Sequence, residues 1–303
     1  MSNKTLISVV GQTAIGKTKL AISLAKEFNT AIISADSRQF YKEMSIGTAV
    51  PSIKELAAAP HHFIQHKSIF ENYSVGDFEK EGLALISNLF KKTNILILVG
   101  GSGLYVDAIT KGLDEFPEVP PEIRNELNSR LKKEGITTLQ KELKEKDPKH
   151  ANRIDLNNPH RLVRALEICI GTGKPYSSFL NKKKKKRPFN IITIGINAER
   201  EIVYDRINHR VDLMMEAGLL NEAESLCNHK KLNALQTVGY RELFNYFDKI
   251  WELEFAISEI KKNTRRFAKR QMTWFKKNED TLWVDFKYDI KEVVSKVKNK
   301  INE

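Results

Sequence analysis

The sequence predicts an α/β fold in which helices cover both faces of a parallel sheet and a helical insertion interrupts the core. Two observations predict the sheet. Short apolar runs alternate with segments of helical spacing, which is typical of parallel strands buried on both faces, and a glycine-rich turn directly follows the first run. The third observation predicts the insertion, because a polar stretch in the middle of the chain contains no convincing strand.

The first part of the chain supplies most of the predicted sheet. Apolar runs predict strands over residues 5–10, 31–35 and 94–99. Apolar side chains recur at helical spacing over residues 17–28 and 78–91, which predicts helices that pack on the sheet. We therefore assign residues 1–112 to the core.

The composition and the hydrophobic pattern of the sequence change after residue 112. A proline-rich boundary is followed by polar segments with helical patterns at 122–134, 137–146 and 159–171. A strand pattern returns at 191–196, and further helices are predicted at 199–217, 219–229, 240–247 and 252–278. Residues 113–190 are thus the predicted insertion, and residues 191–303 complete the core.

Length and composition exclude several classes of protein. At about 150 residues per domain, 303 residues are enough for two domains. No stretch approaches the roughly 18 to 20 apolar residues of a membrane span. Cys169 and Cys227 are far apart and outside any C-x-x-C spacing, so disulfides and cysteine metal sites are not expected and a cytoplasmic location is.

The positive charge of the chain is concentrated in two zones. The net charge is +12. Residues 113–190 hold 18 basic and 11 acidic residues, and residues 257–278 hold 8 basic residues and a single acidic one. The six consecutive cations at 182–187 predict a surface loop. An excess of this sign suits a polyanionic partner.

The glycine-rich turn matches the phosphate-binding pattern G-x-x-x-x-G-K-[ST]. It lies between a predicted strand and a predicted helix, the context that this motif requires. Backbone N–H groups at the helix N-terminus would surround a di- or triphosphate, while Lys17 pairs with its oxygens and Thr18 holds Mg²⁺. The core is therefore P-loop NTPase-like, and its phosphate-binding residues are Gly11, Gln12, Thr13, Ala14, Ile15, Gly16, Lys17 and Thr18.

A carboxylate is predicted beside this loop. NTPases place a metal-ordering Asp at the end of a second strand, but the strand at 94–99 ends in Gly100 and Gly101 instead. Asp36 directly follows the strand at 31–35, on the edge of the sheet where ligands bind. It can accept a proton from a nucleophile, or it can cap a turn; the sequence leaves both open.

Seven motifs in order give the chain a family resemblance. They are GQTAIGKT (11–18), DSRQ (36–39), IGTA (46–49), VGGSGLY (99–105), NPHRLVRALE (158–167), VGYRE (238–242) and TRRFAKRQMTW (264–274). Together they resemble the tRNA dimethylallyltransferases, also called isopentenyl-tRNA transferases. The resemblance extends from about residue 5 to residue 285.

The resemblance implies an activity. A dimethylallyl group passes from dimethylallyl diphosphate to N6 of the adenine at tRNA position 37, 3′ of the anticodon, and the P-loop holds the prenyl diphosphate rather than ATP. The implied catalytic residues are Asp36 as base, Ser102 near the adenine and Arg210 at the leaving group, with Mg²⁺ as cofactor. Ser102 replaces the threonine more usual in the family and keeps the hydroxyl. We expect a monomer whose partners are the anticodon stem-loop and the prenyl donor.

The resemblance also implies a tRNA-binding surface, since the target base must be extruded from the anticodon loop. The implied contacts lie in five of the motifs, with Arg124 in addition. They are Asp36, Ser37, Arg38, Gln39, Ser102, Arg124, His160, Arg161, Leu162, Val163, Arg164, Val238, Gly239, Tyr240, Arg241, Arg265, Arg266, Lys269 and Arg270. Within residues 257–278, the seven-residue spacing of Ile260, Phe267 and Trp274 predicts a packed stripe rather than a surface for base stacking.

Three other functions compete with this interpretation. An adenylate isopentenyltransferase acting on a free nucleotide would not need the insertion or the basic late helix. A P-loop small-molecule kinase would use Asp36 as base toward a hydroxyl. A non-catalytic RNA-binding protein would not need Asp36, Lys17, Thr18 and Ser102 together.

Overall fold

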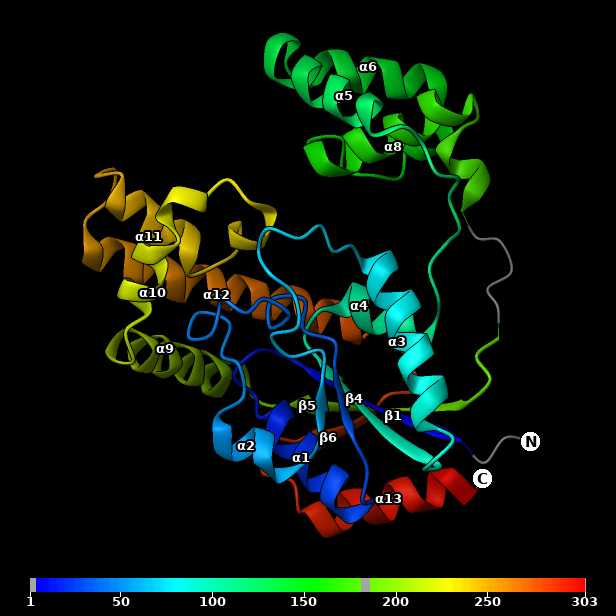
Figure 1. Cartoon of the computed structure of the whole chain (residues 1–303), viewed down its shortest axis with the longest axis vertical. Coiled ribbons are helices and arrows are strands. Elements are labelled where there is room, and N and C mark those ends of the chain that lie inside the picture. Colours follow the sequence, from blue (N-terminus) through cyan, green and yellow to red (C-terminus); the bar gives the residue numbers. More distant parts are fainter. Residues whose placement is uncertain (1–3, 181–185, 303) are drawn as a thin grey trace. The chain divides into compact units, whose positions relative to one another are not determined.

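The chain divides into two compact units. The computed structural model describes residues 4–180 and 186–302 (Figure 1), so most of the cation run at 182–187 lies outside the described residues. One unit comprises Met1–Lys111 and Arg187–Glu303, and the other comprises Gly112–Lys186. The predicted α/β fold is confirmed by the first unit.

The core unit contains a six-stranded, wholly parallel sheet. Its order is β3-β2-β4-β1-β5-β6. All seven residues of the central strand β1 are buried, because both of its faces and both of its edges are covered. The strands, in chain order, are β1 (Thr5–Gly11), β2 (Ile32–Ser34), β3 (His61–His62), β4 (Ile95–Gly100), β5 (Asn190–Asn197) and β6 (Leu282–Asp285).

Helices cover the two faces of this sheet (Figure 1). On one face, α1 (Lys17–Glu27) and α13 (Ile290–Asn302) pack against side chains of β1, β4 and β5. On the other face, α3 (Val75–Leu89) and α4 (Gly103–Thr110) enclose a second cluster. The start of α3 is set by Ser74, which forms a capping box with Asp77; such a pair satisfies two backbone donors of the first turn.

A third hydrophobic cluster lies between the later helices. They are α9 (Arg200–Glu216), α10 (Leu219–Ser225), α11 (Tyr240–Phe247) and α12 (Leu253–Phe275). Tyr41 and Met44 pack into this cluster, so it anchors the chain that follows β2. A short helix, α2 (Ile53–Ala58), is capped by Ser52 and Glu55.

In the described residues of the second unit, all of the regular secondary structure is helical. Its helices are α5 (Pro121–Glu134), α6 (Ile136–Lys146), α7 (Pro148–Ala151) and α8 (Pro159–Thr172), followed by a 3₁₀ turn at Tyr176–Phe179. They surround a small core of their own, which includes Leu127, Leu139 and Leu166. Asn158 caps α8 through its side chain, and Gly173 ends it in a left-handed conformation. Across residues 4–180 and 186–302, none of the helices has both the length and the apolar character that a membrane span requires.

Candidate active site

The P-loop forms a cradle between β1 and α1. Gly16 precedes α1 with a φ of 105° and no side-chain cap, a conformation that costs glycine little. The N–H groups of the first turn are therefore left for a ligand, as at other phosphate-binding helix N-termini. Gly16, Lys17 and Thr18 line a cavity of about 500 Å³.

The cation of the cradle is largely withdrawn from water. Nζ of Lys17 donates to the carbonyl of Gln12 at 2.7 Å. Desolvation lowers the pKa of Lys17 from 10.5 to about 8, while Asp36 raises it and Arg210 lowers it. A nearby anionic ligand would favour the charged form, so the cradle is suited to bind a diphosphate.

A second cavity, of about 490 Å³, adjoins the first. It is lined from the turn after β2, from the loop after β4 and from helices α9 and α12, and among its residues are Ser102, Val238, Gly239, Arg241 and Trp274. Five residues line both cavities, namely Thr13, Asp36, Thr48, Ala49 and Arg210. The predicted base and the predicted leaving-group arginine thus stand where the two cavities meet.

Asp36 is held by the turn that it begins. Its Oδ1 accepts from the backbone N–H of Arg38 at 3.1 Å, so the carboxylate caps a turn and also faces both cavities. Ser102 lies against the same turn: its Oγ accepts from the N–H of Ser37 at 3.2 Å and lies 3.1 Å from Oγ of Ser37. The structure therefore brings Asp36 and Ser102 together from the ends of neighbouring strands.

The residues after Asp36 are engaged in internal contacts. The guanidinium of Arg38 donates to the carbonyls of Asn233 and Ala234, at 3.0 Å each. Gln39 donates to the carbonyls of Thr48 and Ala49, at 3.3 and 2.8 Å. These contacts hold residues 48–49 and 233–234 against the turn after Asp36, and together the turn and residues 48–49 form one wall of the site.

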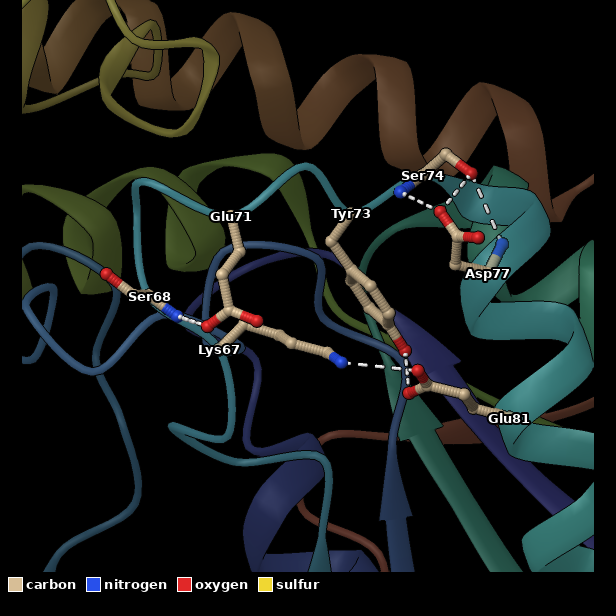
Figure 2. A network of polar contacts seen from close by, with 7 residues as sticks. All are labelled: Lys67, Ser68, Glu71, Tyr73, Ser74, Asp77 and Glu81. Atoms are coloured by element: carbon tan, nitrogen blue, oxygen red, sulfur yellow. Dashed lines mark hydrogen bonds and ion pairs between the residues drawn. The ribbon is translucent and has the colours of Figure 1, made fainter.

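The segment at 67–74, here called the outer strap, connects this wall to helix α3 (Figure 2). Lys67 exchanges backbone hydrogen bonds with Phe40 and Lys42, so the strap begins beside the chain that follows Asp36. Glu81 of α3 accepts from Nζ of Lys67 at 3.2 Å and from the hydroxyl of Tyr73 at 2.8 Å, as Figure 2 shows. The strap is thereby tied to the helical layer.

Arg210 projects from α9 between the cavities. Its pKa is lowered by desolvation, against the fields of Asp36 and Glu55. Within the described part of the chain, its guanidinium forms no hydrogen bond or ion pair. A half-buried cation in this position is available to a ligand anion.

Helix α12 forms the opposite wall. The buried Gln271 accepts from the N–H of Thr13 at 2.8 Å and donates to the carbonyl of Gly101 at 2.9 Å. One side chain thus ties the P-loop to the loop after β4. The predicted packed stripe on this helix is wrong in part, because Ile260 is buried whereas Phe267 is 38% exposed and lines the second cavity.

The basic residues of α12 differ in their surroundings. Arg270 lies over the ring of Phe267 and lines the second cavity. Arg265 donates to the side chain of Asn208 at 2.7 Å, Arg266 donates to that of Asn263 at 3.3 Å, and Lys269 is exposed. These side chains leave a basic surface along the helix.

One implied contact of the core unit is buried. Tyr240 is fully inaccessible, and its hydroxyl donates to Glu222 at 2.6 Å. Its pKa is raised by burial first and by Glu222 second. The side chain of Tyr240 therefore supports the wall instead of facing a ligand, whereas the neighbouring Arg241 is exposed.

The helical unit presents part of the implied tRNA surface. His160 and Arg161 are exposed at the start of α8. Leu162 and Val163 are buried in the core of the unit, at 0% and 5% exposure, because their positions face the neighbouring helices. Their side chains are thus removed from the implied contact surface.

Two arginines of this unit share one carboxylate. Oε2 of the buried Glu167 accepts from Arg124 at 2.7 Å and from Arg164 at 3.0 Å. Arg164 also lies over the ring of Phe116. Such pairing fixes the two guanidinium groups on the surface of the unit.

Sequence reasoning missed the carboxylates that organise the site. Glu222 lies in an ordinary helical segment, and its backbone partners are distant in sequence, whereas Glu55 forms a local capping box with Ser52. The buried Gln271 was likewise missed, although its place within the last motif was a signal. In the parts of the chain that the structure describes, no three His, Cys, Asp or Glu side chains gather as metal ligands.

Comparison with known proteins identifies the family. The model of the IPP transferase family matches residues 39–278. The chain is 61% identical to the tRNA dimethylallyltransferase of Flavobacterium johnsoniae, over 96% of each chain, and 60% identical to that of Christiangramia forsetii, over 100% of each.

Solved structures agree with these matches. The full-length tRNA isopentenylpyrophosphate transferase of Bacillus halodurans is 37% identical, with a TM-score of 0.74 over 99% of this chain and 97% of that one. A eukaryotic dimethylallyltransferase acting on tRNA is 28% identical, with a TM-score of 0.80 over 93% of this chain and 74% of that one. The chain therefore belongs to the IPP transferase family, whose relatives at 60% identity are tRNA dimethylallyltransferases.

Proposed function

We propose that the protein transfers a dimethylallyl group from dimethylallyl diphosphate to N6 of the adenosine at position 37 of tRNA and releases diphosphate. The observation that carries this proposal is the pair of adjoining cavities that share Asp36 and Arg210. One cavity contains the phosphate cradle, and the other has room for a base. The reacting carbon then lies between them, beside a carboxylate and a cation.

The donor end of the site stabilises the leaving group. As the C–O bond of the allylic diphosphate breaks, negative charge grows on the departing oxygens. Lys17, the first N–H groups of α1 and Arg210 are placed to receive that charge. Fixed donors in a partly dehydrated site contribute a large share of catalysis, since they need no reorganisation during the reaction.

The cradle also fits Mg²⁺. Thr18 lines the first cavity and carries a hydroxyl, and oxygen atoms are the ligands that this ion prefers. Thr18 would hold the ion against the diphosphate, where it would supply further neutralisation of the leaving group. The other residues of the cradle keep the roles described above.

The acceptor end activates a poor nucleophile. The lone pair of the adenine amine is delocalised into the ring, so a proton must leave N6 as the new C–N bond forms. The carboxylate of Asp36 is placed to accept this proton, with Ser102 fixing the turn that carries it. A positioned base of this kind contributes about 10²- to 10⁴-fold in rate.

We assign RNA binding to both units. Extrusion of the target base costs a few kcal/mol in unstacking, and phosphate contacts offset that cost. The exposed cations of the helical unit, including Arg161 and Arg124, and the basic face of α12 supply such contacts. We infer that residues 113–190 form the tRNA-binding insertion and that a monomer suffices for the reaction, because all of the assigned residues belong to one chain.

The two rival enzymes are less well supported. An adenylate isopentenyltransferase would leave the helical unit and the basic face of α12 without a role. A small-molecule kinase would require ATP in the cradle. Both rivals predict prenylated or phosphorylated products that contain no tRNA.

One experiment separates these activities. The purified protein is incubated with total tRNA, Mg²⁺ and dimethylallyl diphosphate in the absence of ATP, and digested nucleosides are analysed by mass spectrometry. We expect prenylated adenosine from tRNA and none from free AMP. Prenylation of AMP alone, or turnover of ATP with no use of the prenyl donor, would contradict the proposal.

A further inference from the structure

The carboxylate of Glu222 collects four donors from distant parts of the core unit. Its Oε2 accepts from the backbone N–H groups of Ser45 and Ile46, at 3.0 and 2.8 Å. Its Oε1 accepts from the N–H of Gly47 at 2.9 Å and from the hydroxyl of Tyr240 at 2.6 Å. Glu222 lies on α10, about 175 residues further along the chain than the N–H groups that it binds.

Three consecutive N–H groups that converge on one anion form a backbone nest. Such nests bind phosphates and other anions in many proteins, and here the anion is supplied by the chain itself. Glu222 forms no ion pair within the described residues, so backbone dipoles and one phenol alone balance its charge. Hydrogen bonds to an ionised acceptor are the stronger kind, so the loop at 45–47 is firmly held.

The loop fixed in this way continues into the wall between the two cavities. Thr48 and Ala49 line both cavities, and Ala49 takes a left-handed φ of 50°, which a free alanine disfavours. The carbonyls of these two residues accept from Gln39, three residues after Asp36. A continuous set of contacts therefore joins Glu222 to the turn that bears the proposed base.

Close packing leaves this loop little freedom. A Cβ on Gly47 would stand 2.6 Å from the ring of Tyr240, so the glycine lies directly against the buried phenol. Tyr240 thus packs its ring against the loop and donates its hydroxyl to Glu222. Release of the nest would let the loop move relative to the ring.

We propose that Glu222 is a positioning residue for prenyl transfer: its carboxylate fixes the 45–49 loop and, through Gln39, the placement of Asp36 between the two cavities. This inference rests on the proposed function. It predicts that the loss of the carboxylate slows the chemical step more than it weakens binding of either substrate.

The test compares four variants in single-turnover prenylation of a tRNA anticodon stem-loop. Glu222→Gln replaces one of the two acceptor oxygens by an amide NH₂ group. This group is a donor, and it would face donors of the loop or of Tyr240 instead of accepting their hydrogen bonds. Misplaced reacting groups slow catalysis sharply, so we expect a rate constant lower by about tenfold or more, with the stem-loop Kd and the donor KM within about twofold. Glu222→Asp keeps the charge and should recover part of the rate, and Tyr240→Phe, which removes one donor of four, should have the smallest effect of the three.

Glu224→Gln is the matched control, because Glu224 is exposed on the same helix and, within the described residues, forms no hydrogen bond or ion pair with residues 45–47. It should react at the wild-type rate. A merely structural role for Glu222 would lower the melting temperature and the amplitude of the single turnover, which reports the active fraction, but not its rate constant. That result, with the wild-type protein active, would overturn this inference alone; failure of the wild-type protein to prenylate RNA would instead overturn the proposed function.

Discussion

The pH dependence of donor use tests the placement of Lys17 in the cradle. Desolvation lowers the pKa of this side chain to about 8. A group with that pKa is about nine-tenths protonated at pH 7 and about one-tenth protonated at pH 9. Because kcat/KM reports ionisation in the enzyme before the donor binds, kcat/KM for dimethylallyl diphosphate should fall about tenfold between these two pH values.

Saturation with donor should remove most of this dependence. A bound diphosphate raises the pKa of a neighbouring cation, so kcat should change much less than kcat/KM over the same range. Both constants can be obtained from initial rates of prenyl transfer to an anticodon stem-loop that is held at saturation.

Lys17→Arg is the matched variant, because a guanidinium stays protonated throughout the range. The pH dependence of its kcat/KM reports every ionisation except that of Lys17, including that of the prenyl donor. The ratio of the wild-type kcat/KM to the variant kcat/KM therefore reports the ionisation of Lys17 alone. The ratio should fall about tenfold from pH 7 to pH 9. A ratio that is constant with pH would refute the reasoning, because it would show that the cation of the cradle is fully charged at pH 9.

Three further predictions concern single substitutions. The pKa of Lys17 is lower in the folded protein than in the unfolded chain, so its positive charge destabilises the ligand-free protein, and this effect is complete at pH values below about 8. Lys17→Met removes the charge and should therefore raise the free energy of unfolding at pH 7 by about 1–3 kcal/mol, as measured by calorimetry. The range allows for the partial contact of this side chain with solvent. Asp36→Ala should lower turnover by about 10²- to 10⁴-fold without loss of stem-loop binding in a filter assay; unchanged turnover would remove Asp36 from the mechanism. Phe267→Ala should weaken stem-loop binding by about 1–3 kcal/mol, the contribution of one stacked base, and Phe267→Tyr should leave the affinity unchanged. If Phe267→Ala binds the stem-loop as tightly as the wild type, Phe267 serves packing and not base stacking.

Buried periodic elements were predictable from the sequence, and short peripheral ones were not. The strands β1, β2, β4 and β5 are apolar runs that the core requires, so their pattern is visible without the structure. The strand β3 has two residues and β6 has four, which is too short for a period to emerge. Helix α13 was missed as well, although its apolar residues pack against α1.

Motif residues were predictable in identity but not in exposure. The resemblance transferred whole segments, so it included Leu162, Val163 and Tyr240, which the structure buries. It also gave no access to Glu222, since a single glutamate on a helix carries no sign of a loop 175 residues away. The periodicity of α12 misplaced Phe267, because a seven-residue spacing does not distinguish a helix that packs on a core from one that borders a cavity.

The packing of the sheet accounts for the departure from the NTPase pattern. Hydrolases of this fold place a carboxylate at the end of a second strand to order a metal. At the end of β4, a Cβ on Gly100 would stand 2.6 Å from the carbonyl oxygen of Ala35, and one on Gly101 would collide with Gln271. Close contact between β2, β4 and α12 therefore leaves no room there for an acidic side chain.

The carboxylate comes instead from the turn after β2, one strand away, where Asp36 borders both cavities. Under the proposed function, Asp36 in that place would face the acceptor and Arg210 would face the leaving group. The same glycines that exclude a carboxylate from β4 also allow Gln271 to bind the P-loop. Close packing at this one strand end thus accounts for a phosphate cradle that is suited to group transfer between two cavities.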